Sequence, residues 1–202
     1  MRRTKEEADV TRTTLLNAAL TVFSRKGYEA TRLDDIADEA HVTRGAIYHH
    51  FGSKLELYNA LLAERFARAN QVWEEVIESG GTPMQILRRL IVTSLQYLEE
   101  DADYRAVQEL VMFKSPMIPE LQDGIRQKQI GQRAYIDYLA RLVEQGVDAG
   151  EVRPGTNPRD AALAVLGMMN GVSILWMFDP QLFSLRARAE SIADTFLNGI
   201  AV

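Results

Sequence analysis

Apolar residues recur at helical spacing along almost the whole chain, and this pattern restricts the fold more than any other feature. The first segment follows the order i, i+3, i+4, i+7, i+8, with Leu15, Ala18, Ala19, Val22 and Phe23. Gly27 then suits a left-handed cap at the end of this helix. Similar segments follow, divided by Gly and Pro, and none alternates convincingly like a strand. The sequence therefore predicts an all-α fold with about nine helices.

Helix starts are marked by capping residues. Two capping boxes are predicted, one from Thr31 to Asp34 and one from Ser53 to Glu56. Further starts are predicted at Thr82-Pro83, Asn157-Pro158 and Ser184. These positions divide the chain into short N-terminal helices and longer helices after residue 53.

Composition excludes several classes of protein. The chain has 202 residues and no cysteine, so disulfides, thiolate nucleophiles and cysteine zinc sites are excluded, and the cytoplasm is the expected location. The net charge of -5 argues against nonspecific coating of nucleic acid. Residues 1 to 58 hold nine Lys/Arg and nine Asp/Glu, so any DNA contact must depend on local placement of charge.

Residues 161 to 178 form an uncharged segment that is just long enough to cross a membrane. Asn170, Ser173 and two glycines lower its hydrophobicity, and no basic flank would orient it. The alternative is a helix that is buried on several sides in a soluble protein. We expect this second arrangement, with no membrane partner.

All three histidines lie between residues 41 and 54, but their spacing does not suit a metal. His49 and His50 are neighbours that point about 100° apart on a helix, and no suitably spaced carboxylate joins them. The chain also lacks a G-x-S-x-G motif and any Ser or Thr with an identifiable base. We therefore expect no metal, no catalytic residues, no cofactor and no enzymatic activity.

The same stretch has the pattern of a helix-turn-helix. A short helix over 31–40 is followed by a tight turn at His41-Val42 and a second short helix over 43–51. In the second helix Ile47 and Phe51 are predicted to face inward. The outward face is then Arg44, Gly45, Tyr48 and His49.

That outward face suits the major groove of DNA. Arg44 can reach a guanine edge, Gly45 and Ala46 allow close approach of the backbone, and Tyr48 can contact a thymine methyl group and a phosphate. His50 and Lys54 are predicted phosphate ligands, as are Thr31 and Thr43 at helix starts. The predicted DNA-binding residues are Thr31, Thr43, Arg44, Gly45, Ala46, Tyr48, His49, His50 and Lys54. A solvated helix pair without DNA binding has the same spacing.

Residues 31–54, together with the upstream pattern Ala18-Ala19-x-x-Val22-Phe23-x-x-x-Gly27-Tyr28, resemble the DNA-binding domain of the TetR family of bacterial repressors. The resemblance covers nearly all of residues 10–58. His41 departs from it, because the family has glycine in this turn. Histidine tolerates positive φ better than most residues, so we expect a left-handed backbone at His41.

The resemblance implies an N-terminal three-helix helix-turn-helix DNA-binding domain over residues 1–58 and a larger C-terminal helical bundle for ligand binding and dimerisation over residues 59–202. It implies a homodimer that pairs its last two helices, about 158–178 and 184–199. The expected stripe on the last helix is Leu185, Ala189, Ile192, Phe196 and Leu197. Such a dimer would read a pseudo-palindrome in double-stranded operator DNA, with half-sites about 34 to 36 Å apart or a multiple of this distance.

Two further stretches, residues 108–114 and 170–183, resemble the repressors of multidrug efflux pumps. By this resemblance a small hydrophobic or aromatic effector occupies a cavity among the middle helices. The candidate lining is Phe66, Gln108, Val111, Met112, Ile136, Leu166, Met169 and Asn170. Met and Leu at helical spacing also suit plain core, so Asn170, as a buried amide in need of partners, is the most informative of them.

The predicted function is a ligand-responsive transcriptional repressor that leaves its operator when the effector binds, and its expected target is a drug-efflux operon. The alternative is a helical ligand- or partner-binding module without DNA binding, which the neutral N-terminal region favours slightly.

Overall fold

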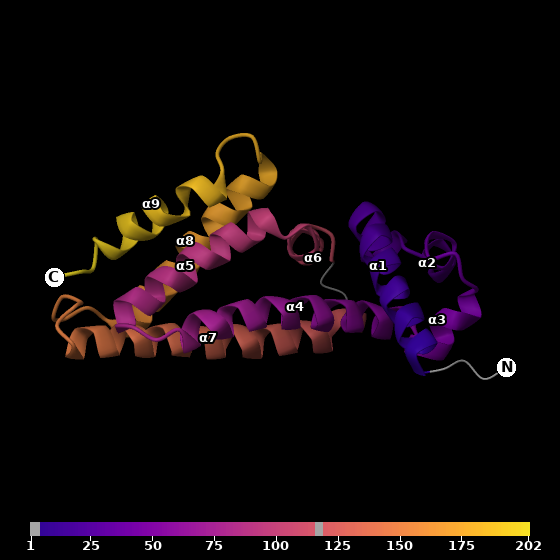
Figure 1. The fold of residues 1–202 in the computed structure, drawn as a ribbon, viewed down its shortest axis with the longest axis horizontal. Helices are drawn as coiled ribbons and strands as arrows, with labels where there is room; N and C mark the ends of the chain where they lie inside the picture. The colour runs from indigo at the N-terminus through magenta and orange to yellow at the C-terminus, as the bar shows by residue number, and fades with distance from the viewer. Residues whose placement is uncertain (1–4, 116–118) are drawn as a thin grey trace. The chain divides into compact units, whose positions relative to one another are not determined.

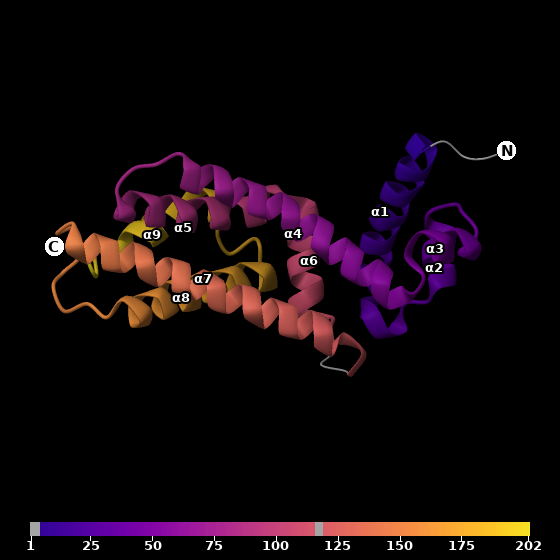
Figure 2. The same ribbon diagram turned by 90° about the horizontal axis from the view of Figure 1, so that it is seen from below.

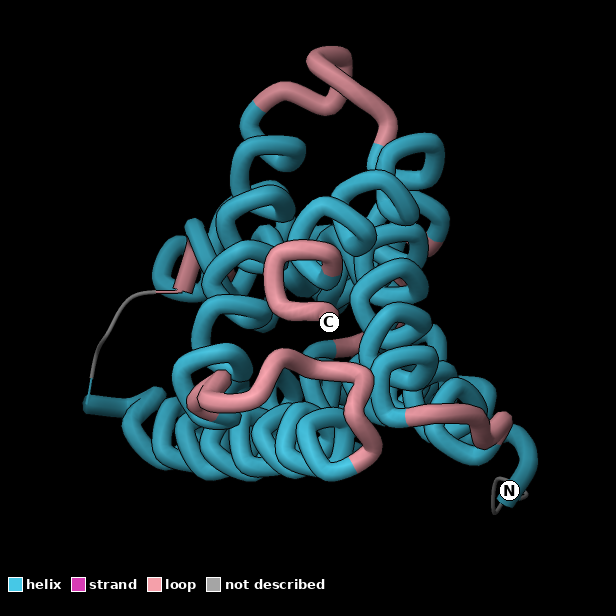
Figure 3. Tube along the Cα trace, turned by 90° about the vertical axis from the view of Figure 1, so that its left-hand side faces the viewer, coloured by secondary structure: helices cyan, strands magenta, loops and turns pink. Residues whose placement is uncertain are grey.

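The computed structural model describes residues 5–115 and 119–202, and the described chain consists of helices joined by loops (Figure 3). In these ranges the only strand-like pairing is an isolated bridge between Val152 and Ala201. The predicted all-α fold is confirmed. The α-helices are α1 Lys5–Ala30, α2 Leu33–Glu39, α3 Arg44–Phe51, α4 Lys54–Glu78, α5 Pro83–Glu100, α6 Ala102–Phe113, α7 Gln122–Asp148, α8 Pro158–Phe178 and α9 Leu185–Leu197, and a 3-10 helix η1 spans Pro119–Leu121.

Side-chain caps begin the later helices where the sequence predicts them. Thr82 accepts a hydrogen bond from the N–H of Gln85, and Ser184 accepts one from Ala187. Asn157 accepts from the N–H groups of Arg159 and Asp160 at 2.9 and 3.1 Å. The start of α2 lies one residue later than predicted, because Asp35, and not Asp34, accepts the hydrogen bond from the backbone N–H of Arg32 at 3.0 Å. The carboxylate of Asp34 is therefore available for another partner.

Two compact units make up the chain. Unit 1 contains the residues up to Arg68 together with Asp103–Ile125, and unit 2 contains Ala69–Ala102 and Arg126–Val202. Unit 1 thus holds α1 to α3, the first part of α4 and almost all of α6. The predicted boundary at residue 58, between a DNA-binding domain and a domain for ligand binding and dimerisation, remains a prediction.

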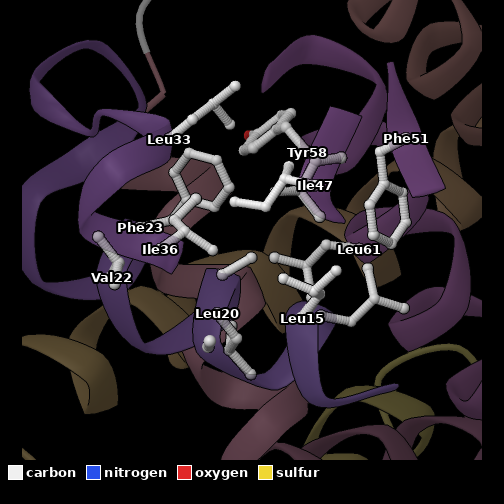
Figure 4. Packing of buried hydrophobic residues seen from close by; sticks show 14 of the residues in the cluster. Leu15, Leu20, Val22, Phe23, Leu33, Ile36, Ile47, Phe51, Tyr58 and Leu61 are labelled. Atoms are coloured by element: carbon white, nitrogen blue, oxygen red, sulfur yellow. The ribbon is translucent and has the colours of Figure 1, made fainter. Parts of the chain in front are cut away.

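The core of unit 1 is a cluster in which the short helices share their apolar faces. α2 packs on α1 and α3 packs on α2 (Figures 1 and 2). Ile36 of α2 and Ile47 of α3 are fully buried and point into the same cluster as Phe23, Tyr58 and Leu61 (Figure 4). The spacing of the apolar residues therefore predicted the shared core of the two helices correctly.

His41 and Gly27 are among the residues with positive φ. His41 has φ 54° between α2 and α3, so the left-handed turn is confirmed with histidine in the place of glycine. Gly27 has φ 75° and ψ 171°, a conformation that is essentially restricted to glycine. A Cβ at Gly27 would also lie 3.2 Å from the carbonyl oxygen of Lys114. Gly27 thus allows the end of α1 to approach the end of α6 closely.

In unit 2, α9 packs mainly on α5. Arg88 of α5 pairs with Asp194 at 2.6 Å and with Glu190 at 3.2 Å, and its guanidinium holds the pKa of Asp194 below its ordinary value. Glu99 of α5 accepts hydrogen bonds from the hydroxyl of Ser184 at the start of α9. These polar contacts lie beside the buried apolar face of α9.

The stripe on α9 that was expected to meet a partner subunit is largely buried within the single chain. Leu185, Ala189 and Leu197 are buried, and Ile192 and Phe196 are half-buried. This expectation is wrong for the buried residues, because α5 of the same chain covers that side of α9. Helical spacing shows that a face is apolar, and it does not show which element covers it.

One side of α8 is uncovered. Its exposed positions are Leu163, Ala164, Gly167, Asn170, Gly171, Leu175 and Phe178. Within the described chain α8 is the only helix long and apolar enough to span a membrane, with mean hydropathy 1.8 over an 18-residue window of which 28% is buried. The expectation that α8 is buried on several sides therefore holds only for the side that carries Ala161, Val165 and Trp176.

Candidate nucleic-acid interface

The outward face of α3 lies where the sequence predicts it. Ile47 and Phe51 are buried in the core of unit 1, whereas Thr43, Gly45 and His49 are exposed. Tyr48, with 46% of its surface exposed, belongs to the same outer face. The orientation is therefore confirmed, while contact of this face with DNA remains a prediction.

Arg44 forms a small network on this face. Its Nη1 lies 3.2 Å from Oδ2 of Asp34, and its Nη2 donates a hydrogen bond of 2.8 Å to the hydroxyl of Tyr48. The guanidinium also stacks on the Tyr48 ring, 5.4 Å from its centroid. The hydrogen bond with Tyr48 and then the charge of Asp34 raise the pKa of Arg44 above its ordinary value. The side chain is thus held in place while it remains 53% exposed.

Among the described residues, no contact explains the glycine at position 45. A Cβ there would meet only the hydroxyl of Thr43 at 3.7 Å, which is ordinary contact, and the φ of Gly45 is not positive. Glycine inside a helix is about 0.5–1 kcal/mol less favourable than alanine. A residue of this kind on an exposed face suits close approach of another molecule to the backbone. The half-buried Ala46 beside it is also small.

The two adjacent histidines contact each other. Their ring centroids lie 5.4 Å apart, and the ring of His50 lies 6.2 Å from that of Phe51. Over residues 5–115 and 119–202 no group of three His, Cys, Asp or Glu side chains is placed to hold a metal ion. His49 and His50 lie in the last turn of α3, the end of a helix at which a positive charge is favourable.

Thr31 does not offer its hydroxyl to phosphate. The residue is 2% exposed, and its Oγ1 donates a hydrogen bond of 2.7 Å to the carbonyl oxygen of Gly27. The prediction that this hydroxyl binds DNA is contradicted, because the hydroxyl closes the turn after α1. Thr43 is exposed, and its hydroxyl does not cap α3, so this predicted contact stays open.

The ammonium group of Lys54 is likewise hydrogen-bonded within unit 1. Its Nζ donates to the carbonyl oxygens of Tyr28 at 3.0 Å, Thr31 at 3.2 Å and Glu29 at 3.5 Å. It also lies 4.3 Å from the centroid of the Tyr28 ring. An ammonium group has three donors, and all three are used here. Lys54 thus ties the start of α4 to the end of α1, which counts against the predicted phosphate contact, and that contact stays a prediction.

Replacing Lys54 with methionine is expected to lower the free energy of unfolding by about 1–3 kcal/mol, because partly buried carbonyl groups lose their donor. The salt dependence of DNA binding is expected to stay unchanged. Chemical denaturation and DNA titrations at several salt concentrations measure the two quantities. Lys26→Met is the control, since Lys26 makes an exposed ion pair with Asp35 worth about 0.2–1 kcal/mol. A salt slope reduced by about one per protomer would show instead that Lys54 contacts phosphate.

The end of α6 is bonded to α1 and α4, the helices on either side of α2 and α3 in the sequence. Lys114 donates from Nζ to the carbonyl oxygen of Ser24 at 2.6 Å, and its own carbonyl accepts from the N–H of Tyr28 at 3.3 Å. The hydroxyl groups of Tyr58 and Ser115 are 2.5 Å apart. No local sequence pattern marks these residues, because each bond joins segments more than 50 residues apart.

Tyr28 continues this connection. Its hydroxyl donates to Glu120 of η1 at 2.7 Å, and its ring stacks near Phe23 at 5.9 Å and packs edge-on against Tyr58 at 4.9 Å. Burial first, and then the charge and hydrogen bond of Glu120, raise the pKa of Tyr28 far above its ordinary value. The phenol therefore stays protonated and acts as a fixed donor to Glu120.

Arg65 is a second residue that the sequence did not reveal. It is buried, with its guanidinium bonded to Asn17 of α1 and to the neighbouring Glu64. Its Nε lies 3.3 Å from a carboxylate oxygen of Asp103 at the start of α6. Both ends of α6 are thus connected to elements of unit 1.

Four of the predicted effector-binding residues belong to unit 1. Phe66 and Val111 lie partly buried at the edge of its core, and Phe66 meets the Tyr104 ring edge-on at 6.4 Å. Gln108 is half-buried and donates from Nε2 to the hydroxyl of Tyr104 at 2.6 Å, while Met112 is half-buried. These side chains share α6 and the adjoining part of α4.

The other four belong to unit 2, where Ile136 and Leu166 are half-buried and Met169 is buried. Asn170 is exposed on the uncovered side of α8. The prediction of a buried amide at this position is wrong, so the reason for assigning Asn170 to a ligand disappears. The remaining assignments stay predictions.

A short exposed helix, presented by a second short helix in an all-helical chain, is the arrangement found in helix-turn-helix DNA-binding proteins. Residues 15–61 match the family described as bacterial regulatory proteins, tetR family, and residues 82–201 match the C-terminal region of the MAATS-type transcriptional repressors. The chain belongs to the tetR family of bacterial transcriptional regulators. The resemblance noted in the sequence is therefore confirmed.

Relatives with known functions match along nearly the whole chain. The transcriptional regulator TtgR of Pseudomonas putida is 34% identical over 98% of this chain and 95% of its own length. The structure of NalD, the secondary repressor of the MexAB-OprM multidrug efflux pump in Pseudomonas aeruginosa, has a TM-score of 0.83 at 28% identity and covers 96% of this chain and 97% of its own. SmeT, the repressor of a Stenotrophomonas maltophilia efflux pump, was solved with triclosan and has a TM-score of 0.77 at 28% identity, covering 96% and 92%.

Proposed function

We propose that the protein is a cytoplasmic homodimeric repressor that binds a pseudo-palindromic operator and controls a drug-efflux operon. The observation that carries the proposal is the exposed face of α3, with Arg44 held outward over Tyr48 and with Gly45 unexplained by internal packing. Arginine is the commonest partner of guanine in the major groove. The repressors NalD and SmeT, which act on efflux pumps, support the assignment to an efflux operon.

The uncovered side of α8 supports a dimer. Leu163, Leu175 and Phe178 are exposed there beside Gly167 and Gly171. Small residues between apolar ones allow two helices to approach closely, and an exposed apolar patch of this kind marks an interaction site. A second copy of this side would bury it around a two-fold axis. We propose a partner subunit, and not lipid, as the covering surface.

We further propose that the effector is a small apolar or aromatic molecule that contacts α6. Phe66, Gln108, Val111 and Met112 offer a mostly apolar, half-buried surface with one amide. The triclosan complex of SmeT supports an aromatic ligand.

Release of the operator would follow from the bonds that join the end of α6 to α1 and α4. Movement of Lys114 and Ser115 would be passed to Ser24, Tyr28 and Tyr58. The effector must bind the released state more tightly than the DNA-bound state. A coupling of about 1–3 kcal/mol would change operator affinity about 5- to 150-fold.

Fluorescence anisotropy with labelled DNA from upstream of the protein's own gene tests this function, with triclosan as the aromatic probe. We expect saturable binding at low salt, one dimer per site by light scattering, and weaker binding when triclosan is added. An intact dimer that binds no DNA at low salt would contradict the proposal. It would favour instead the helical module without DNA binding.

A further inference from the structure

An acidic side chain stands within the proposed DNA-binding face. Asp34, in the first turn of α2, is 61% exposed, and its nearest charged partner is Arg44 of α3 at 3.2 Å. Asp35 beside it is engaged elsewhere, by Lys26 at 2.8 Å and by the backbone of Arg32. A carboxylate so close to a DNA surface would be repelled by phosphate, so its position calls for a compensating role.

Folding stability does not supply that role. An exposed ion pair contributes little to stability because water screens it and both side chains lose freedom. The helix start is already served by Asp35, which accepts the backbone N–H of Arg32. Asp34 instead fixes Nη1 of the Arg44 guanidinium, while Tyr48 accepts a hydrogen bond from Nη2 and its ring stacks on the guanidinium plane.

The held guanidinium keeps enough donors for a base. Arginine has five N–H groups, and these two bonds use two of them. A bidentate pair with O6 and N7 of guanine needs two more. Because the plane of the group is set before DNA arrives, less side-chain entropy is lost when the pair forms.

The ion pair between Asp34 and Arg44 also disfavours contact of Arg44 with DNA phosphate. If Arg44 turned to a phosphate, it would leave Asp34 unpaired next to the negative backbone of the DNA. If Arg44 stays in place and meets guanine, the ion pair persists. The carboxylate thus penalises the nonspecific mode more than the specific one, which is how repulsive elements create specificity.

We propose that Asp34 is a positioning residue that sets base specificity, by holding Arg44 for guanine and against phosphate. The inference rests on the proposed function, since it presupposes that the α3 face binds operator DNA. It adds that one base pair per half-site depends on an acidic side chain of α2 that is expected to touch no base itself.

The test compares base preferences of full-length variants. DNA sites are first selected from a random pool by the wild-type protein, and affinities are then measured for a series with each base pair of one half-site replaced in turn. Asp34→Asn keeps the size of the side chain and removes its charge. Asp38→Asn is the matched control, because Asp38 is an exposed acid on the same helix α2 and is not among the polar partners of Arg44, which are Asp34 and Tyr48.

For Asp34→Asn we expect discrimination at one G·C pair to fall by a factor within about 5 to 150, with the other positions unchanged. Asp38→Asn is expected to keep the wild-type profile. In an Arg44→Ala background, Asp34→Asn should have no further effect at that pair. Asp34→Glu, which keeps a carboxylate on α2, should retain more discrimination than Asp34→Asn.

Three results would overturn the inference. The first is that Asp34→Asn and Asp38→Asn give the same base-preference profile. The second is that Asp34→Asn loses discrimination equally at every base pair of the half-site. The third is that Asp34→Glu loses as much discrimination at the G·C pair as Asp34→Asn. Thermal unfolding of each variant shows whether the protein has lost structure in general, which would explain an equal loss of discrimination at every base pair. A wild-type protein that selects no sequence at all would contradict the proposed function itself and is therefore a separate outcome.

Discussion

Replacing Arg44 with alanine is expected to weaken operator binding by about 30- to 20,000-fold, because a bidentate guanine contact worth about 1–3 kcal/mol is lost in each of two half-sites. Folding should be nearly unaffected, since the side chain is exposed and its ion pair with Asp34 lies at the surface. Anisotropy titrations with the operator and thermal unfolding measure the two effects.

Arg141→Ala is the matched control for this loss of charge. Arg141 is exposed on α7 in unit 2 and stacks near Tyr138 at 5.8 Å. Its removal is expected to leave operator affinity within about twofold, because only long-range screened charge is lost. A similar loss of affinity in both variants would show that bulk charge, and not the α3 face, carries binding.

Replacing Phe23 with alanine is expected to lower the free energy of unfolding by about 3–5 kcal/mol, as for other large aromatic residues in cores. Phe23 is completely buried, and its ring stacks with Tyr28 and meets Tyr58 edge-on at 5.3 Å. Loss of the ring leaves a cavity where α1, α4 and the end of α6 meet. Denaturant unfolding measures stability, and operator binding is expected to fall with it.

Phe113→Ala serves as the control, because Phe113 belongs to the same unit and has 47% of its surface exposed. We expect its truncation to cost less than about 1 kcal/mol, since surface substitutions usually change stability little. Equal destabilisation by the two substitutions would contradict the packing at Phe23.

The bonds at the end of α6 have a consequence for regulation. Lys114, Ser115 and Glu120 contact α1 and α4, and helix α6 carries Gln108, Val111 and Met112. A helix that carries the proposed effector-binding residues and is bonded at its end to α1 and α4 could respond to both the effector and DNA. This arrangement gives the proposed release of DNA a physical route within unit 1.

Local features of this chain were readable from its sequence. Caps at Thr82, Asn157 and Ser184 lie where predicted, since a capping hydroxyl or amide needs only the next two or three N–H groups. The inward face of α3 follows from the spacing of Ile47 and Phe51, whereas the left-handed turn at His41 was expected from the family resemblance, in which glycine stands at this position. The caps and the inward face of α3 depend on interactions within a few residues, so the neighbouring residues in the sequence specify them.

Features that depend on distant partners were not readable in this way. Lys54 and Thr31 look like phosphate ligands until the end of α1 is brought beside them and uses their donors. The apolar stripe of α9 was assigned to a partner subunit, although α5 covers it, and Asn170 was expected inside although it lies outside. Spacing and residue type establish what a side chain can bind. Which carbonyl, helix or solvent it meets depends on how segments far apart in the chain pack together, because hydrogen bonds and burial act over a few ångströms in space.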